Sequence, residues 1–529
     1  MAKTEYDVDV LIAGAGPSGL MLACQLLLHN ISFRIIDKKA SPAIHSGALI
    51  IHARTLEILD QMGLAEKAIE AGIVARSIQI RFDSQNTKTI DISRFGIGLT
   101  RFPFFLMLEQ WKTENLFIEF LEAKNFNVEN NTELVSFTND DVLVTSEIRT
   151  ENGAIEVIKS RFLIGADGTN SLVRKQLGIP FNGKTHQQRL FIADCEARLS
   201  GVGQEILFSF TNGYTLGCFP LTGNRWRIDG LIPLIQMKED AGFEDVKNFF
   251  AADIDSGFEL LNPQWFSVFR SHSRCAESFR QKRCFLVGDA AHVHSPVGAQ
   301  GMNTGMQDSY NLAWKLAFYI QGKASETLLD TYEVERRPLA LNVIRYTDFA
   351  YSLMTSGSFL ARLFRLQLFP LVLPLLISRF KKNTSMQTHI FKAVSGIGIN
   401  YGSKMSIDLP NDHFPSNAPK PGVRLTYMPF EIEKEPANRL DSFISGFYHL
   451  IVLGKAVLPK SFQSVIDENS EMITVNYIRK EVGTLQLFNS LGIEDSGWYL
   501  IRPDLYIASR SLEFNATDFG KSLQKYLKS

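Results

Sequence analysis

The sequence predicts an α/β protein with several domains, and three separated segments carry this prediction. In each segment a short apolar strand runs into a turn that contains glycine and then into a helix. Units of this kind build a parallel sheet, and ligands bind where the carboxyl ends of its strands meet the turns. The chain has 529 residues, more than one hydrophobic core usually holds, so further domains are expected beside this Rossmann-like sheet.

The first segment lies near the N-terminus. Residues 8–13 form an apolar strand, Gly14 to Gly19 read GAGPSG, residues 20–28 have helical character, and a second strand ends at Asp37. The GxGxxG pattern permits a tight turn and a close approach of the backbone to a pyrophosphate, and a carboxylate placed like Asp37 meets an adenosine ribose. A glycine turn with a purely structural role is the alternative. The predicted nucleotide contacts are Gly14, Gly16, Ser18, Gly19, Asp37 and Lys38.

The second segment, residues 284–317, is the most informative stretch of the chain. After an apolar strand, Gly288 permits a sharp turn and Asp289 is presented at the strand's carboxyl end, where its carboxylate can accept hydrogen bonds from a chain of hydroxyls. Glycines then keep side chains off the path of a flat ligand, and a helix from about Asn303 directs its positive end at that ligand. A tight connection without a ligand is the alternative. The predicted contacts are Asp289, Pro296, Gly298, Gly301, Met302 and Asn303, with Pro296 and Gly298 nearest the reactive ring.

The third segment, residues 162–174, again places Gly and Asp167 after an apolar strand. Together, GAGPSG, GADGTNSLVR and GDAAHVHSPVGAQGMNTG resemble the class A flavoprotein monooxygenases, which are single-component aromatic hydroxylases. The resemblance implies noncovalent FAD, with Asp167 among its contacts, and NAD(P)H as a transient reductant. It also implies that one oxygen atom from dioxygen enters an aromatic, phenolic or polyketide-like substrate through a flavin C4a-hydroperoxide.

The same fold is also compatible with other functions. The protein could be an epoxidase, or a non-catalytic FAD-binding subunit for assembly or sensing. The resemblance further suggests Arg54, in HARTLEIL, and Gln110 as FAD ligands, although without it both read as ordinary polar residues of helices. Ser46-Gly47-Ala48 departs from the family, where a basic residue often precedes the HART segment. No general base for the substrate is evident, and Arg225 and Arg227 are only weak candidates for charges that face it.

The remaining segments complete a prediction of four parts. An aromatic-rich, β-forming region is expected to make the substrate pocket, with Phe210, Phe219 and Trp226 as candidate contacts and an ordinary core as the alternative. The C-terminal part resembles the thioredoxin-like domain of the phenol hydroxylase branch, in which an RPD turn joins two strands; without a CxxC it implies a structural or dimer-supporting role. The parts are an FAD-binding domain at 1–75, 105–180 and 274–345, a substrate-binding sheet at 76–104 and 181–273, a helical connector at 346–409 and a thioredoxin-like domain at 410–529.

The charge balance and the cysteine content limit the classes of partner and the cellular compartment that are expected. Lys and Arg number 55 against 56 Asp and Glu, so no basic surface for nucleic acid is expected, and dioxygen and a small aromatic molecule remain as partners. The five cysteines are odd in number and scattered, which favours reduced thiols in the cytoplasm. Asp7 and Asp9 interrupt the first apolar stretch, unlike in a signal peptide. His292 and His294 form HxH without an evident third ligand, so no metal is predicted.

One apolar stretch, residues 363–378, raises the question of a membrane. Pro370 and Pro374 interrupt it and basic residues flank it, so it reads as too short for a transmembrane segment. Burial against the flavin domain or a partner subunit, as in a homodimer, is the favoured interpretation. A peripheral membrane contact is the alternative.

Overall fold

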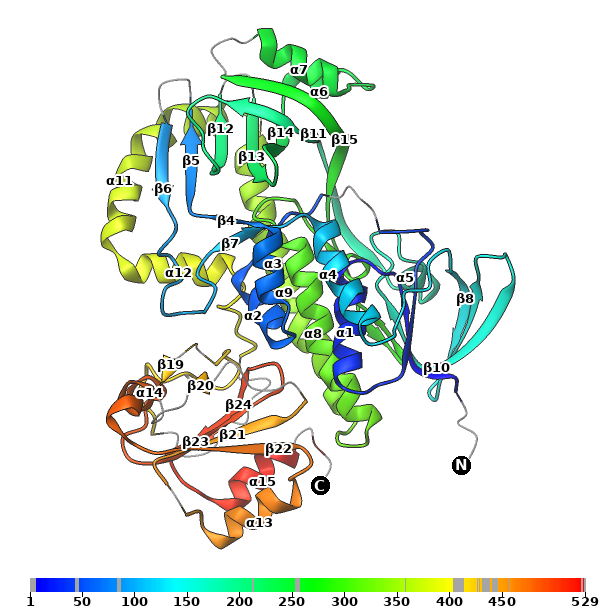
Figure 1. Cartoon of the computed structure of the whole chain (residues 1–529), viewed down its shortest axis with the longest axis vertical. Helices are drawn as coiled ribbons and strands as arrows, with labels where there is room; N and C mark the ends of the chain where they lie inside the picture. Colours follow the sequence, from blue (N-terminus) through cyan, green and yellow to red (C-terminus); the bar gives the residue numbers. More distant parts are fainter. Residues whose placement is uncertain are drawn as a thin grey trace.

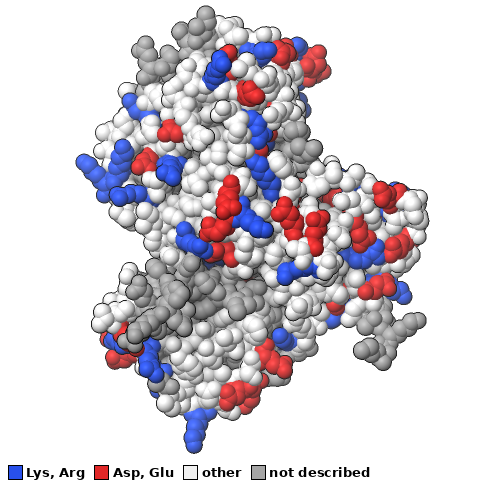
Figure 2. Space-filling model, viewed as in Figure 1, with Lys and Arg blue, Asp and Glu red and all other residues white. Residues whose placement is uncertain are grey.

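The computed structural model shows three bodies arranged along the long axis of the molecule (Figure 1). A body with a partly parallel sheet and long helices lies in the middle, a large and mostly antiparallel sheet lies above it, and a smaller α/β body lies below. Positive and negative side chains are interspersed over most of the visible face (Figure 2). The structure describes residues 6–42, 47–82, 87–211, 214–252, 257–356, 358–402, 413–425, 427, 429–430, 438–439, 446–455, 457–524 and 527.

The middle body contains a seven-stranded sheet in which the three predicted strands are neighbours. β10 lies between β1 and β17, both pairs are parallel, and β2 pairs in parallel with the other side of β1. The three glycine turns therefore follow adjacent parallel strands and meet at one edge of the sheet, as predicted. The strands are β1 (Val8–Ala13), β2 (Phe33–Ile36), β8 (Glu133–Asn139), β9 (Val144–Arg149), β10 (Ile155–Gly165), β16 (Arg280–Gln281) and β17 (Cys284–Leu286).

Helices α1 and α8 pack against each other beside this edge (Figure 1). Their close approach depends on glycine: a Cβ at Gly288 or Gly305 would lie only 2.3 or 2.4 Å from Ser18 Oγ. Ser18 is thus used for packing between the first and second segments. The helices of this body are α1 (Pro17–Leu28), α2 (Ala53–Gln61), α3 (Ala65–Ala71), α4 (Gln110–Glu122), α5 (Leu172–Gln176), the 3-10 helix η2 (Gly288–Ala290), α8 (Gly301–Ile320) and α9 (Thr327–Thr355).

The upper body is an eight-stranded sheet in the order β18-β15-β11-β14-β13-β12-β5-β6. One face packs under helices α6 (Pro233–Met237) and α7 (Phe243–Ala252), and the other face is turned toward β3 (Ile50–Ile51), β4 (Ile73–Ala75) and β7 (Phe105–Met107). The strands are β5 (Ser77–Arg81), β6 (Thr87–Asp91), β11 (Phe181–Leu199), β12 (Ile206–Phe210), β13 (Thr215–Leu221), β14 (Arg225–Leu231), β15 (Phe258–Ala276) and β18 (His292–Val293).

The apolar stretch at 363–378 belongs to a longer helical run that passes beside β5 and β6 (Figure 1). It comprises α10 (Phe359–Leu363), a π-helical segment η3 (Phe364–Leu368) and α11 (Phe369–Lys382), and α12 (Thr384–Val394) follows. The run Phe359–Lys382, of 24 residues, is long and apolar enough, by length and composition alone, to cross a membrane. Only 6% of its most apolar 18-residue stretch is buried. The expected burial against the flavin domain is therefore wrong: one side of α11 contacts the upper sheet, and the rest is exposed.

The lower body contains a four-stranded sheet in the order β22-β21-β23-β24. β21 is parallel to β22 and antiparallel to β23, which is antiparallel to β24. The predicted RPD turn does join two strands, β23 and β24. The elements are β21 (Tyr448–Leu453), α13 (Lys460–Glu468), β22 (Ile473–Ile478), the 3-10 helix η6 (Val482–Thr484), α14 (Leu485–Leu491), β23 (Gly497–Ile501), β24 (Ile507–Ser511) and α15 (Ala516–Gln524), with a separate pair β19 (Pro429–Phe430) and β20 (Asn438–Arg439).

A buried ionic network fastens the lower body to α8 and α9. Arg502 donates to Glu335 Oε1 and Oε2 at 2.5 and 3.0 Å, and to both carboxylate oxygens of Asp504. Lys315 donates to Glu335 Oε2 at 2.8 Å. The positive neighbours lower the pKa of Glu335 to about 2 against the opposing effect of burial. Because removing one partner would leave a buried charge unpaired, this network fixes the lower body in place.

Candidate active site

The first glycine turn combines close packing with one open position. Gly14 has φ +105°, and a Cβ there would lie 2.3 Å from Ala166 O; a Cβ at Gly19 would lie 1.9 Å from Gly14 O. A Cβ at Gly16 would have no atom within 4 Å. Gly14 and Gly19 are thus required by the fold itself, whereas Gly16 keeps a space open at the N-terminal end of α1. That space suits a phosphate group at a helix N-terminus.

Asp37 closes the same turn from the end of β2. Its Oδ2 accepts a hydrogen bond of 2.7 Å from the Ala15 amide, and its Oδ1 accepts one of 2.9 Å from the Lys39 amide. Each carboxylate oxygen keeps a further lone pair for a ligand hydroxyl. The neighbouring Lys38 is exposed.

The other two turns bring two carboxylates to the ends of adjacent parallel strands. Asp167 Oδ2 accepts from the amides of Leu172 and Val173 at 2.6 and 3.2 Å, while its Oδ1 is buried and has no partner in the described part of the chain. Asp289 is exposed at the end of its strand, yet desolvation by the surrounding protein raises the pKa of its carboxyl, and a hydrogen bond from Thr169 opposes this. A buried oxygen without a partner beside an accessible carboxylate is the arrangement expected where a polar ligand binds.

Residues 294–300 form a loop, called here the ring loop, that is fastened to helix α2. His52 Nε2 lies 3.2 Å from the carbonyl oxygens of both Gly298 and Ala299. Burial lowers the pKa of His52 to about 4, so the neutral imidazole donates from Nε2 to these carbonyls. Pro296 and Gly298 themselves are exposed, and Gly298 has φ +83°, a conformation that favours glycine. His52 gave no signal in the sequence beyond its place in the HART segment.

Asn303 ties the start of α8 to the same region. Its Oδ1 accepts from the His52 amide (2.9 Å) and Thr55 Oγ1 (2.8 Å), and its Nδ2 donates to the carbonyls of Ile50 (2.7 Å) and Ala299 (3.1 Å). The Asn303 side chain is therefore fully used by the protein. The first backbone bond of the helix runs from Thr304 N to Gln300 O, so the earlier amides of Gly301, Met302 and Asn303 point out of the helix end.

A buried ionic brace lies beneath the second turn. Asp308 accepts from Arg336 Nε and lies 2.7 Å from His292 Nε2, and the Gly288 amide donates to the same carboxylate at 3.2 Å. His292 thus packs under the second turn. Asp308 and Arg336 were not predicted, because acidic and basic residues in long helices ordinarily indicate solvated faces.

The two further candidate ligands, Arg54 and Gln110, differ in where their side chains lie: Gln110 bonds a glutamate that interacts electrostatically with Asp37 of the first turn, whereas Arg54 lies elsewhere. Arg54 donates to Glu57 Oε2 at 3.1 Å and to the Asp504 carbonyl at 2.8 Å, which places its guanidinium at the lower body. Gln110 donates to Glu114 Oε1 at 2.8 Å. The hydrogen bonds of Arg54 therefore give it a structural role between the bodies and do not bring it to the glycine turns.

Half-buried phenylalanines gather where the upper sheet meets the ring loop. Phe95, Phe105, Phe208 and Phe219 belong to one cluster, and Phe105 packs edge-on against the His52 ring at 5.5 Å. Half-buried aromatic side chains that converge on a loop of this kind are typical of a pocket for a flat apolar ligand. We call these four side chains the aromatic face.

Only one of the three predicted substrate contacts, Phe219, belongs to the aromatic face. Phe210 is buried against Phe82 and helix α11. Trp226 packs in the core under α7, which is the ordinary-core alternative. In β14 the charged residues that share the side of Phe219 are Arg225, Arg227, its cross-strand partner, and Asp229. Arg225 donates to Glu109 Oε1 at 3.0 Å.

Arg227 and Asp229 differ in their hydrogen bonding. Arg227 is buried and forms two hydrogen bonds of 2.7 Å with Asp194. Asp229 lies opposite Gly217, where a Cβ would come within 2.7 Å of Asp229 Oδ1, so glycine makes room for the carboxylate. No other described residue donates a hydrogen bond to it. Burial raises the pKa of Asp229 to about 7, and the nearby Arg227 opposes this. The sequence did not single out Asp229, because its position opposite Gly217 follows only from the register of the strands.

Comparison with known proteins identifies the family. Residues 7–347 match the model of the FAD binding domain family. The chain belongs to this family. It is 32% identical over 538 residues to 6-methylpretetramide 4-monooxygenase of Streptomyces rimosus, covering 98% of this chain and 93% of the relative. It is 34% identical to pentachlorophenol 4-monooxygenase of Sphingobium chlorophenolicum, over 64% of each chain.

Solved structures agree with the arrangement of all three bodies. The anhydrotetracycline hydroxylase OxyS of Streptomyces rimosus superposes with a TM-score of 0.76 at 27% identity, over 98% of this chain and 99% of that one. The complex of aklavinone-11 hydroxylase with FAD and aklavinone gives a TM-score of 0.81 at 22% identity, over 98% and 99% of the two chains. This member of the FAD binding domain family is accordingly an FAD-dependent monooxygenase of aromatic compounds.

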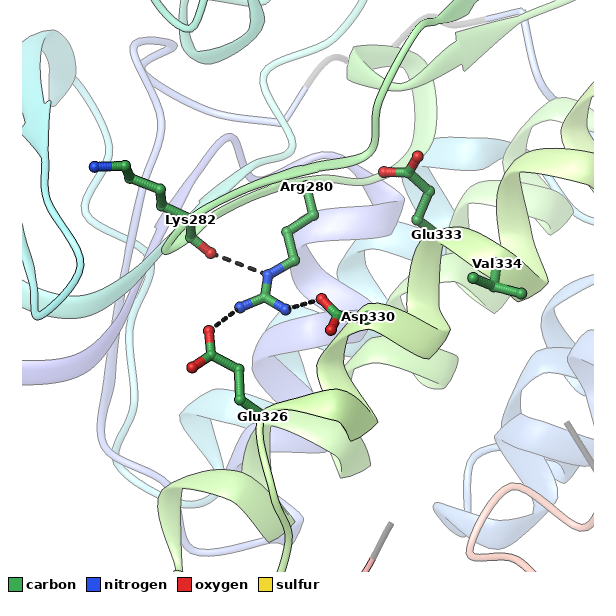
Figure 3. A pocket seen from close by; sticks show the side chains of 6 residues that line it. All are labelled: Arg280, Lys282, Glu326, Asp330, Glu333 and Val334. Carbon is green, nitrogen blue, oxygen red and sulfur yellow. Dashed lines mark hydrogen bonds and ion pairs between the residues drawn. The ribbon is translucent and has the colours of Figure 1, made fainter. Parts of the chain in front are cut away.

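A separate surface pocket of this monooxygenase lies away from the turns, between β16 and the start of α9 (Figure 3). Arg280 points into it and forms ion pairs with Glu326, at 2.5 Å, and Asp330. Glu333, also in its wall, accepts from Ser278 Oγ and the Phe279 amide. Its charges are thus satisfied by the protein, and its lining lacks the aromatic side chains that an aromatic substrate needs. We assign it a structural role.

Three buried histidines make the folded state sensitive to acid. Burial lowers the pKa of His29, His52 and His294 from 6.5 to about 4. Between these values the unfolded chain binds protons that the folded chain does not, so the free energy of unfolding should fall as pH drops from 6.5 to 4, by about 1.4 kcal/mol per pH unit for each histidine. Denaturant titrations across this range measure the slope. His52→Gln, which keeps an N–H donor for the ring loop, should reduce it, whereas the same change at the exposed His413 should not; equal slopes would contradict the assignment.

Proposed function

We propose that this monooxygenase hydroxylates a polycyclic phenol of the polyketide type, held between the aromatic face and the ring loop. The observation that carries the proposal is the contact of Phe105 with His52, because it joins the aromatic face directly to the loop. The named substrates of the relatives, among them 6-methylpretetramide and aklavinone, support a fused-ring substrate.

The residues at the three turns fit the cofactor of the family. We place the FAD pyrophosphate in the open space at Gly16, between Gly14 and Gly19, and the adenosine ribose at Asp37. Asp289 would accept hydrogen bonds from the ribityl hydroxyls, and the amides of Gly301, Met302 and Asn303 would hold the polar edge of the ring. The unpartnered Oδ1 of Asp167 supports a polar ligand here. When bound, FAD accepts electrons from NAD(P)H and activates dioxygen.

The chain's own contribution to the chemistry is a proton acceptor. We assign that role to Asp229, because its carboxylate shares the side of Phe219, has room opposite Gly217 and has no other described donor. It accepts the proton of a substrate hydroxyl, which enriches the ring in electrons and favours attack by an electrophilic oxygen. Arg227, held in place by Asp194, provides a fixed positive charge beside the resulting phenolate.

The other parts of the chain have supporting roles in this proposal. Residues 1–75, 105–180 and 274–345 bind FAD, and residues 76–104 and 181–273 bind the substrate. The strand order β22-β21-β23-β24, with β23 antiparallel to its neighbours, supports a thioredoxin-like class for the C-terminal domain, and the buried Arg502 network supports a structural role for it. A cytoplasmic location fits the five buried free cysteines.

Isotopic labelling tests the reaction. Purified protein with FAD and NAD(P)H should convert a member of a panel of polycyclic phenols to a product that carries one oxygen atom from labelled dioxygen and none from labelled water. The second oxygen atom of dioxygen should leave as water. A hydroxylated aromatic ring distinguishes this product from an epoxide. Product oxygen derived from water, or equal product formation without dioxygen, would falsify the proposal.

A further inference from the structure

An exposed apolar ridge runs along α10, η3 and α11. Its outward side chains include Phe359, Leu360, Leu368, Leu371 and Leu375, of which Leu371 and Leu375 are 72% and 71% exposed. We call the exposed apolar side chains of residues 359–376 the ridge. A single exposed leucine is ordinary, but a continuous ridge over several helical turns marks an interaction surface.

The orientation of the ridge is fixed by the opposite side of α11. Phe369, Leu373 and Ile377 follow one another at helical spacing and pack against Phe82 and Phe210 of the upper sheet. Phe380 adds a ring contact with Phe95 at 4.3 Å. Because this side is already occupied, the helix cannot turn its outer apolar side chains inward.

The charges along this helical run are of one sign. Residues 359–382 contain no Asp or Glu, and Arg379, Lys381 and Lys382 are exposed at its C-terminal end. Arg365 is different, since it donates to the carbonyls of Leu353, Met354 and Ser356 and so caps helix α9. Lys381 interacts electrostatically with the carboxylate of Asp91 in β6. The ridge therefore combines apolar surface with a net positive charge.

We propose that the ridge docks the protein on the surface of an anionic lipid membrane, with the helix lying in the plane of the interface. Apolar side chains that enter the headgroup boundary beside lysines and arginines are what such a surface binds. A second copy of the chain fits less well, because it would bring two clusters of positive charge together. Spanning the bilayer is opposed by the contacts of Leu373 and Phe380 with the upper sheet. The proposal does not depend on the identity of the substrate.

Vesicle flotation tests the docking with the full-length, FAD-loaded protein. Wild-type protein should float with vesicles of phosphatidylcholine and phosphatidylglycerol, should bind pure phosphatidylcholine far less, and should be released by 0.5 M salt. The double variant Leu371→Glu/Leu375→Glu should lose binding by more than about tenfold, and the triple variant Arg379→Gln/Lys381→Gln/Lys382→Gln by about fivefold for each neutralised residue. Val482→Glu, at a valine that is 90% exposed on the lower body, should bind like wild type.

Each contrary outcome is distinct. Absence of binding by the wild type to anionic vesicles, or equal loss in Val482→Glu, overturns the proposal. A wild-type dimer in light scattering that Leu371→Glu/Leu375→Glu converts to a monomer, without lipid binding by either, assigns the ridge to a second copy. Protein that resists salt and leaves the vesicle only in detergent indicates insertion across the bilayer. Unchanged FAD content and melting temperature of the variants show that they are folded.

Discussion

Gly16→Val should lower the affinity for FAD on the order of a hundredfold or more while leaving the fold intact. A Cβ at Gly16 meets no atom within 4 Å, and the residue has φ −75°, which valine also adopts. The branched side chain would instead occupy the space where we place the pyrophosphate. Titration of the stripped protein with FAD, followed by quenching of flavin fluorescence, measures the loss; a hundredfold change corresponds to about 2.7 kcal/mol.

Two other glycines provide the controls for this experiment. Gly203 is exposed and likewise has no atom within 4 Å of a Cβ, so Gly203→Val should bind FAD normally. Gly14→Val should fail to fold, because its φ of +105° is strained for valine and the new Cβ would meet Ala166 O at 2.3 Å. Gly16→Val protein that purifies yellow with one FAD per chain would show that the pyrophosphate does not use this turn.

The glycine turns could be predicted from the sequence because their determinants are local. A strand, a turn and a helix lie within about thirty residues of each other, and the need of Gly14 and Gly288 for a positive φ is a property of a single residue. The parallel pairing of these strands followed as well, whereas their order, with β10 between β1 and β17, came only from the structure. The RPD turn was recognisable for the same reason.

The buried ionic contacts could not be predicted, because their partners are far apart in the chain. Arg502 pairs with Glu335, 167 positions away, and Arg54 reaches the carbonyl of Asp504 across 450 positions. In the sequence, each of these residues resembles a charge on a solvated surface. Only the docking of the lower body on α8 and α9 turns them inward.

Two of the three predicted aromatic contacts were wrong for a different reason: the sequence does not show on which face of the sheet a side chain lies. Successive residues of a strand point to opposite faces, so a face can be assigned only when the register with a neighbouring strand is known. The pairing of Phe219 with Arg227 puts Asp229 on the side of Phe219 and leaves Trp226 on the other. Aromatic content predicted the nature of the pocket, but not which rings line it.

Asp229→Asn should lower product formation on the order of 10²-fold or more while FAD and substrate still bind, because general base catalysis contributes this much. With a pKa of about 7, the Asp229 carboxylate is ionised above neutrality, so turnover of the wild type should rise with pH through this value and then level off. The asparagine variant should lose that rise and should oxidise NAD(P)H with little hydroxylated product.

Because the pKa of Asp229 is raised, stability and activity should respond differently to Asp229→Asn, which distinguishes a catalytic role from a structural one. Because burial raises its pKa above the ordinary value of 3.8, the ionised carboxylate destabilises the folded state as pH rises through about 7. Asp229→Asn removes that charge, so the variant should melt no lower than the wild type at pH 8 even though it is inactive. A phenol analogue that is already ionised at the assay pH no longer needs a proton acceptor, and it should narrow the difference in turnover between the two proteins. An unchanged pH profile in Asp229→Asn, or an equal deficit with the ionised analogue, would place the proton acceptor elsewhere on the aromatic face.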